Sequence, residues 1–225
     1  MNGKQPLFPK WVDDVTRLIA ILFAGGLLYL VTLTLYATSP RNTAVGYMPG
    51  QPIPYSHKLH VNELGLDCRY CHTGVETGAK ANIPPTQTCM NCHNTIHNQS
   101  PKLEPLFESY RTGKAVEWIR VHDLPDFVFF DHSIHVNKGV GCVECHGRVD
   151  KMETVYQSQP LNMGWCLECH RNPTPRLRPK DKVTDLRPIE EVLGIKTESG
   201  IMDACSELAK EYQVNPKVNC STCHR

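Results

Sequence analysis

The chain has 225 residues, 40% of them apolar, and a formal charge of +1, so its length allows one domain or two small ones. Its eleven cysteines far exceed normal usage, and in a secreted chain they would ordinarily indicate disulfides with one thiol left over. Ten of the eleven fall instead in five copies of Cys-x-x-Cys-His, which argues against a disulfide framework.

An uncharged run of 20 residues, 18–37, is long enough for a helix that crosses a membrane. Three basic residues precede the run, and only Arg41 follows it before Lys58, which predicts an amino terminus in the cytoplasm. A cleaved signal peptide is the alternative, because residues 37–39 are small. The apolar core of a signal peptide is only about 7–15 residues long, so we favour a retained anchor.

A repeat follows the anchor. Residues 38–56 contain four prolines and predict an extended tether. The sequence His-x-x-His-Val-Asn then occurs at residues 57–62 and again at residues 132–137, each time followed by two Cys-x-x-Cys-His motifs. An internal duplication explains this order most economically.

The Cys-x-x-Cys-His pattern is the attachment signature of c-type haem, in which two thiols bind the vinyl groups and the histidine binds iron. Zinc would need cysteine pairs grouped in fours, and a redox dithiol needs no histidine after every second cysteine. We therefore expect five c-type haems. The predicted covalent residues are Cys68, Cys71, Cys89, Cys92, Cys142, Cys145, Cys166, Cys169, Cys220 and Cys223, and the proximal iron ligands are His72, His93, His146, His170 and His224.

The sixth iron ligand decides whether a haem transfers electrons or binds a substrate. Spacing of three places both histidines of each His-x-x-His pair on one side of a helical turn. His122, just before the apolar run 127–130, is the favoured fifth candidate. Ligands for all five irons would favour electron transfer over catalysis. The predicted distal ligands are His57, His60, His122, His132 and His135, with Met163, Met90 and His97 as alternatives.

Haem also predicts the environment of the protein. The propionates would make the finished protein negative, so no nucleic-acid partner is expected. In bacteria this attachment follows export, so we expect an inner-membrane protein with one span, a cytoplasmic amino terminus and a periplasmic haem domain.

The remaining segments show weaker patterns. Apolar spacing predicts an amphipathic helix over about residues 103–119. Residues 171–200 are rich in proline and basic side chains and predict a solvated arm across the surface, although these cations could instead hold propionates or a partner. A short helix follows, with Cys205 on its apolar stripe. This thiol is expected to be buried rather than to act as a ligand or an intermolecular disulfide partner.

About 185 residues beyond the anchor, or about 37 per haem, are too few to enclose each haem in its own domain. The predicted fold is therefore mostly α and irregular, with a single amino-terminal transmembrane helix and haems forming much of the core. The expected segments are 1–37, the cytoplasmic amino terminus and anchor; 38–56, the tether; and 57–225, the haem domain, divided into 57–100, 101–130, 131–170 and 171–225.

These motifs resemble known multihaem cytochromes. The duplicated His-x-x-His with paired haem motifs is similar to cytochromes of the class III and c7 kind. The whole chain resembles the pentahaem cytochrome c subunit of bacterial alternative complex III, a quinol oxidase that feeds periplasmic carriers or a terminal oxidase. The features that carry this resemblance are the amino-terminal helix, Val-His-Asp-Leu-Pro at 121–125, Met-Gly-Trp at 163–165 and Cys-Ser-Thr-Cys-His at 220–224.

The resemblance implies a redox subunit that is not catalytic alone. Its implied partners are an iron–sulfur, molybdopterin-oxidoreductase-like subunit, polytopic quinol-binding membrane subunits and a monohaem cytochrome c subunit, with membrane lipid around the anchor. The alternative is a membrane-anchored multihaem quinol dehydrogenase that feeds a periplasmic nitrite or nitrate reductase. A pentahaem nitrite reductase is disfavoured, because its catalytic Cys-x-x-Cys-Lys site does not occur in this sequence.

Overall fold

The computed structural model describes residues 8–38 and 44–224, and the chain divides into two compact units, Met1–Ala44 and Val45–Arg225. In the first unit, α1 (Lys10–Ala37) is a single helix of 28 residues, about 42 Å long at 1.5 Å per residue. It is the one described helix long and apolar enough to cross a membrane. None of its residues is buried within the protein.

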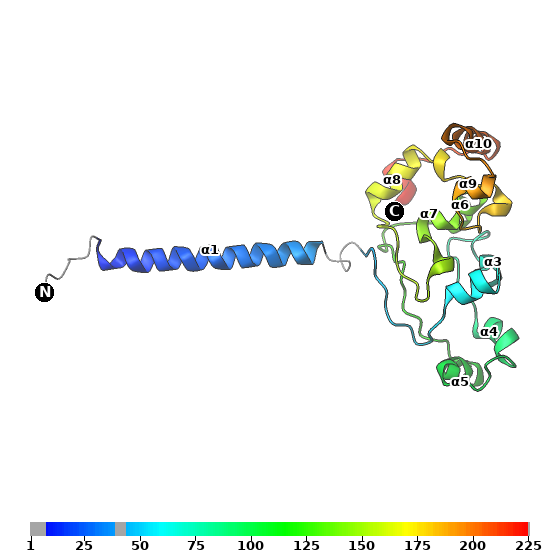
Figure 1. Cartoon of the computed structure of the whole chain (residues 1–225), viewed down its shortest axis with the longest axis horizontal. Coiled ribbons are helices and arrows are strands. Elements are labelled where there is room, and N and C mark those ends of the chain that lie inside the picture. Colours follow the sequence, from blue (N-terminus) through cyan, green and yellow to red (C-terminus); the bar gives the residue numbers. More distant parts are fainter. Residues whose placement is uncertain (1–7, 39–43, 225) are drawn as a thin grey trace. The chain divides into compact units, whose positions relative to one another are not determined.

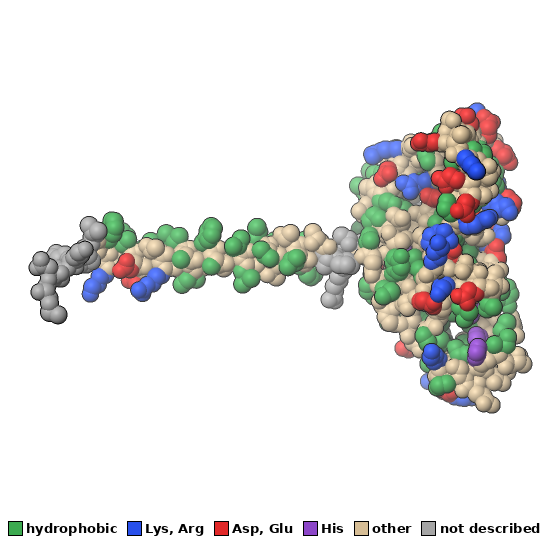
Figure 2. Space-filling view, viewed as in Figure 1, with side chains coloured by type: hydrophobic (Ala, Val, Ile, Leu, Met, Phe, Trp, Pro, Cys, Tyr) green, Lys and Arg blue, Asp and Glu red, His purple; other side chains and the backbone are tan. Residues whose placement is uncertain are grey.

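The surface of α1 suits an apolar environment. Figure 2 shows apolar side chains along the helix and charged groups only toward its amino-terminal end. The hydroxyl groups of Thr16, Thr32 and Thr34 donate to backbone carbonyls four residues earlier at 2.7–2.8 Å. Each hydroxyl is therefore hydrogen-bonded within the helix, which lowers the cost of placing threonine in lipid.

The second unit consists of short helices joined by long ordered loops, and its described residues form no strand beyond two isolated bridges (Figure 1). This confirms the predicted mostly α and irregular fold. Its first half contains η1 (Lys58–Glu63), α3 (Cys68–Cys71), α4 (Thr86–His93), η2 (Pro101–Leu103) and α5 (Glu104–Thr112). The second half contains α6 (His132–Asn137), α7 (Cys142–His146), η3 (Val149–Lys151), α8 (Met163–Arg171), η4 (Thr174–Arg176), η5 (Lys180–Lys182), α9 (Ile189–Leu193), α10 (Glu198–Glu211) and α11 (Cys220–Cys223).

Much of the predicted tether is packed against the rest of the second unit. The amide of Gly46 donates to the carbonyl of Gln157 at 2.7 Å. The side chain of Gln51 both donates to and accepts from the backbone of Ile119, at 2.8 and 3.0 Å. Ile53 is 4% exposed and belongs to the core. The segment between Gly46 and Ile53 therefore belongs to the compact unit rather than to a free spacer.

The helix predicted over residues 103–119 is shorter in the structure. It is α5, which ends where Gly113 adopts φ +72° and donates its amide to the carbonyl of Ser109 at 2.9 Å. A glycine in this left-handed conformation is a common way to end a helix, and residues 113–120 form no helix. Leu106, on the predicted apolar stripe, is 3% exposed and anchors the helix.

The predicted solvated arm contains part of the core, so that prediction was wrong for its central residues. Leu177 is fully buried, and Arg178 and Val183 are 3% and 1% exposed. The Arg178 amide donates to the carbonyl of Gly139 at 2.7 Å, and the amide of Cys142 donates to the carbonyl of Val183 at 2.9 Å. The arm is held by the third motif, so it cannot lie free in solvent.

Helix α10 closes this core as the apolar stripe predicted. Cys205 is fully buried, its thiol donates to the carbonyl of Leu177 at 3.6 Å, and Tyr212 is 9% exposed. The structure confirms that Cys205 is a buried thiol.

Arg178 supports a test of this core. Its guanidinium donates to the carbonyls of Asp185 and Arg187 at 2.9 Å and lies 3.6 Å from the Glu144 carboxylate. Arg178→Ala would remove the buried guanidinium and leave the carbonyls of Asp185 and Arg187 without this donor, while Arg176 stays 3.9 Å from the Glu144 carboxylate. We therefore expect a loss of about 1–3 kcal/mol in the free energy of unfolding. Unfolding of the haem-loaded protein in guanidinium chloride measures this free energy.

The control is Arg111→Ala on the exposed face of α5, where we expect little change in the free energy of unfolding. Equal losses in the two variants would contradict a structural role for Arg178.

Candidate haem-binding sites

Each Cys-x-x-Cys-His motif forms a short helix with its histidine near the carboxyl end. Residues three apart share one face of a helix, so both thiols of a motif point to the same side. Asp67 caps α3 by accepting from the Arg69 amide at 2.8 Å, and Asn162 caps α8 by accepting from the Trp165 amide at 2.9 Å. All cysteines in the described part of the chain are free thiols. Each motif therefore presents two thiols and an imidazole together.

Histidines far apart in the sequence form pairs at a spacing that suits an iron between them. Two imidazoles on opposite faces of one iron, with metal–nitrogen bonds of about 2 Å, have ring centroids about 6.3 Å apart. The three pairs with this spacing are His60 with His93 (6.3 Å), His132 with His146 (6.4 Å) and His135 with His170 (6.1 Å). Each joins a motif histidine to a member of a His-x-x-His pair.

Backbone carbonyls fix the orientation of seven histidine rings. In each case Nδ1 is within hydrogen-bond distance of a carbonyl oxygen, and because a carbonyl only accepts, Nδ1 carries the proton. Nε2 then has a free lone pair for a metal. The pairs are His60 with Ser56 (2.8 Å), His72 with Asn82 (2.7 Å), His93 with Ile96 (3.0 Å), His132 with Ala79 (2.8 Å), His135 with Asp131 (2.7 Å), His170 with Lys217 (2.9 Å) and His224 with Phe127 (3.2 Å).

Two predicted distal ligands lack such a bond. Nδ1 of His57 and Nε2 of His122 are buried without a hydrogen-bond partner among the described residues. Burial lowers the pKa of His57 to about 4, with a further contribution from His72, and lowers the pKa of His122. Burial lowers the pKa of His146 to about 3, and His122 contributes next. These rings are therefore neutral near pH 7, which is the form that binds iron.

The structure places His122 beside the third motif. Its ring lies edge-on to His146 with the centroids 4.5 Å apart, too close for an iron between them. The aromatic ring next to His224 is Phe127, at 5.8 Å. Among the alternative ligands, His97 is exposed, Met163 is 66% exposed, and Met90 is partly exposed within α4.

Two aromatic residues that sequence reasoning missed pack on the histidines of the two His-x-x-His pairs. Tyr55 stacks on His60 with the centroids 4.4 Å apart and lies edge-on to His57 at 4.8 Å. Phe130 repeats this geometry with His135 at 4.6 Å and His132 at 4.8 Å. The sequence signal was available, because an aromatic residue precedes each His-x-x-His by two positions. Each ring restricts the orientation of two imidazoles.

Thiols of different motifs are close enough to shift one another's pKa, which indicates which motifs are neighbours. Burial and then Cys89 raise the pKa of Cys71, and a hydrogen bond with Cys68 and burial raise the pKa of Cys142. Burial and then Cys169 raise the pKa of Cys145 to about 12. Burial and then Cys223 raise the pKa of Cys166. These contacts connect the second motif to the first, the first to the third, the third to the fourth and the fourth to the fifth. The hydrogen bond from His132 to Ala79 also joins the first and third sites.

Comparison with known proteins agrees with this geometry. The family described as cytochrome c7 and related cytochrome c matches residues 53–112 and 128–225. The chain belongs to this family. It is also 34% identical over 143 residues to the menaquinone reductase, multiheme cytochrome c subunit, of Nitratidesulfovibrio vulgaris, covering 54% of this chain and 68% of that protein.

As a member of this family, the chain is a multihaem cytochrome c, and its own residues fit c-type haem. The paired thiols are free, and three histidine pairs have the spacing that an iron between them needs. The carbonyl-bonded Nδ1 atoms leave Nε2 available at seven rings. The family membership and the site geometry therefore agree on the cofactor.

The aromatic contacts lead to a second prediction. Phe130→Leu would remove ring contacts to His132 and His135, each worth about 0.5–1.5 kcal/mol. If both histidines bind iron, the electron paramagnetic resonance (EPR) g-values of two haems should change, because the ring planes of His132 and His135 are no longer held. Tyr55→Phe keeps the stacked ring and is the control. An unchanged EPR spectrum in Phe130→Leu would show that the ring does not orient these ligands.

Proposed function

We propose that this chain is the five-haem electron-relay subunit of a membrane-bound quinone-linked oxidoreductase. The observation that carries the proposal is the set of three histidine pairs at the spacing of two ligands on one iron, within five neighbouring motifs. Two strong ligands on an iron leave no position for a substrate, so this arrangement supports electron transfer rather than catalysis.

The geometry and the repeat support one set of ligands. His60, His132 and His135 would hold iron together with His93, His146 and His170, respectively. By the repeat, His57 is the distal ligand of the first motif, as His132 is of the third. Burial lowers the pKa of His57 and His72 contributes next, so the two imidazoles are near each other, as this pairing requires. His122, with its unpartnered buried Nε2, is proposed as the fifth distal ligand.

Bound haem supplies one-electron redox chemistry. The chain holds the imidazoles through backbone carbonyls, stacks Tyr55 and Phe130 on them, and sets neighbouring motifs side by side. The proposed relay therefore runs through the second, first, third, fourth and fifth haems in that order. The apolar helix α1 is proposed to anchor the chain in the inner membrane, with its amino terminus in the cytoplasm and the haem domain in the periplasm.

Two kinds of complex are compatible with this relay. The motif resemblance favours alternative complex III, in which electrons leave quinol and pass outward to a periplasmic carrier or terminal oxidase. The similarity to a menaquinone reductase subunit favours a complex that delivers electrons to menaquinone instead. Both readings imply polytopic quinone-binding subunits. An iron–sulfur, molybdopterin-oxidoreductase-like subunit and a monohaem cytochrome belong to the first reading.

Purification from native membranes in mild detergent tests the function. We expect polytopic membrane subunits to co-purify and the complex to exchange electrons with a quinone analogue. Quinol-driven reduction of a soluble cytochrome would support alternative complex III, whereas quinone reduction by a periplasmic donor would support the menaquinone reductase type. Recovery of the chain alone, with no quinone-linked activity, would overturn the proposal.

The order of the haems leads to a further prediction. Replacing Cys142 and Cys145 with alanine would remove the central haem and divide the other four into two pairs. We expect stopped-flow reduction from one end to reach only two haems in the fast phase. In the control, Cys89→Ala with Cys92→Ala, all four remaining haems stay contiguous.

Intact mass would verify four haems in each variant. Fast reduction of all four remaining haems without the central one would contradict a linear relay.

A further inference from the structure

One loop supplies the carbonyl acceptors for histidines of two different sites. The loop spans residues 73–82, between the first motif and α4. The carbonyl of Asn82 accepts from Nδ1 of His72 at 2.7 Å, and the carbonyl of Ala79 accepts from Nδ1 of His132 at 2.8 Å. His72 belongs to the first motif, whereas His132 pairs with His146 of the third. Both bonds therefore depend on the same short stretch of backbone.

The loop has little freedom to move. The Gly74 amide donates to the carbonyl of Ala81 at 3.1 Å, and Asn82 has φ +66°, which asparagine tolerates better than most residues. A Cβ on Gly74 would lie 2.3 Å from the carbonyl oxygen of Lys80 and 2.8 Å from Nδ2 of Asn82. Position 74 therefore requires glycine, because the backbone there packs against Lys80, which lies between the acceptor residues Ala79 and Asn82.

The loop is also docked on the helix that carries the distal histidines of the second repeat. The Ser133 amide donates to the carbonyl of Gly78 at 3.1 Å. Nδ2 of Asn137 donates to the backbone carbonyl of Glu76 at 2.9 Å. In the first repeat, Asn62 occupies the equivalent position, and its side chain makes no hydrogen bond within the described ranges.

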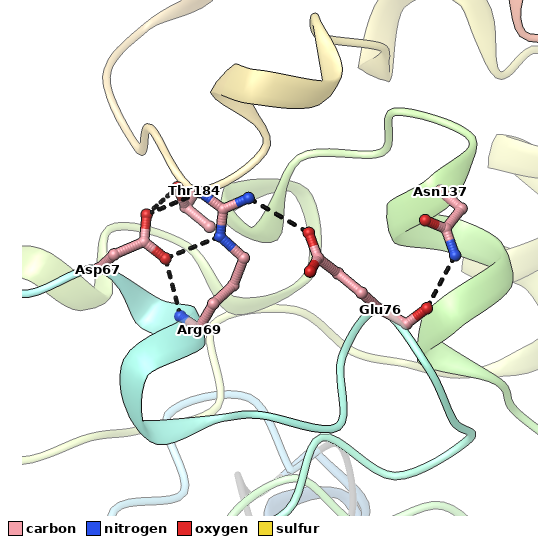
Figure 3. Close-up of polar contacts among 5 residues, drawn as sticks. All are labelled: Asp67, Arg69, Glu76, Asn137 and Thr184. Atoms are coloured by element: carbon pink, nitrogen blue, oxygen red, sulfur yellow. Dashed lines mark hydrogen bonds and ion pairs between the residues drawn. The ribbon is translucent and has the colours of Figure 1, made fainter.

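Ion pairs of Arg69 with Asp67 and Glu76 connect the loop to the helix of the first motif. The Glu76 carboxylate accepts from Arg69 at 3.2 Å, and the Asp67 carboxylate accepts from Arg69 at 2.9 and 3.1 Å (Figure 3). Asp67 also accepts from the Thr184 hydroxyl at 2.9 Å, next to Val183, whose carbonyl binds the third motif. These ion pairs are partly exposed, so each adds little stability. Their role is geometric, because they connect the loop to both sites.

We propose that the 73–82 loop is a shared positioning element that sets the reduction potentials of the first and third haems together. The proposal rests on the proposed function, in that His72 and His132 must bind iron. An Nδ1–H that donates to a carbonyl makes the imidazole a stronger donor to iron and favours the ferric state. A displaced loop weakens both bonds, so both potentials rise. The positioning residues are Gly74 and Asn137.

Two glycines of the loop provide a matched test. Gly74→Ala forces the loop to shift, whereas a Cβ on Gly78 would meet only the carbonyl oxygen of Gly74 at 3.9 Å, an ordinary contact. In redox titration of the full-length, haem-loaded protein, Gly74→Ala should raise two midpoint potentials and alter two EPR signals. Gly78→Ala should change neither. Shifts in one, none or all of the haems, or the same shifts in Gly78→Ala, would overturn the proposal.

A second pair of variants covers the case in which Gly74→Ala fails to mature. Asn137→Ala removes the bond to the Glu76 carbonyl, and Asn62→Ala is its control in the other repeat. We expect smaller upward shifts of the same two potentials in Asn137→Ala and none in Asn62→Ala. No shift in Asn137→Ala would overturn the proposal. If the wild-type protein still shows bis-histidine EPR signals and quinone-linked activity, the proposed function stands and only the shared control by the loop fails.

Discussion

The hydrogen bond from a histidine Nδ1 to a backbone carbonyl is the interaction on which the rest of this structure depends. It determines which ring nitrogen is free for iron and fixes the ring plane at the same time. Seven rings have this bond. The described residues include few fully buried apolar side chains that could hold these rings by packing. Backbone acceptors therefore do much of the positioning that side-chain packing does in larger domains.

This constraint explains why long irregular segments persist in the second unit. His170 is held by the carbonyl of Lys217, 47 residues away, and His224 by that of Phe127, 97 residues away. A helix uses its carbonyls internally, so an acceptor for a distant ring must come from a loop, a turn or a chain end. The loops are ordered because their carbonyls have partners. The buried residues Arg178 and Val183 follow the same logic, since they hydrogen-bond to the backbone around the third motif.

The sequence predicted the parts of this protein that depend on local spacing. The five motifs, the duplicated His-x-x-His, the apolar helix and the buried Cys205 all follow from periodicity or residue type, and the fold class followed from them. The predicted helix over 103–119 was too long because the left-handed Gly113 was not read as a stop. The prediction of a solvated arm was wrong because Leu177 and Val183 are buried, which the basic and proline-rich composition of the segment does not reveal.

The pairing of histidines and the order of motifs could not be predicted, because both depend on contacts between distant segments. Nothing in residues 73–82 indicates that the Ala79 carbonyl binds His132, since any residue carries a carbonyl. Tyr55 and Phe130 could have been noticed from their equivalent positions in the repeat. Their role needed the ring distances. The proposed role of His57 rests on the repeat, and that of His122 rests on its buried Nε2, which has no partner among the described residues.

A cryo-electron microscopy map of the mature protein in its membrane complex would test the arrangement most directly, because it locates every iron relative to its ligands. We expect one iron between His60 and His93, one between His132 and His146, and one between His135 and His170. We also expect the haem of the first motif to lie between those of the second and third. Irons bound by other histidine pairs, or a first haem at the end of the row, would contradict the relay described above.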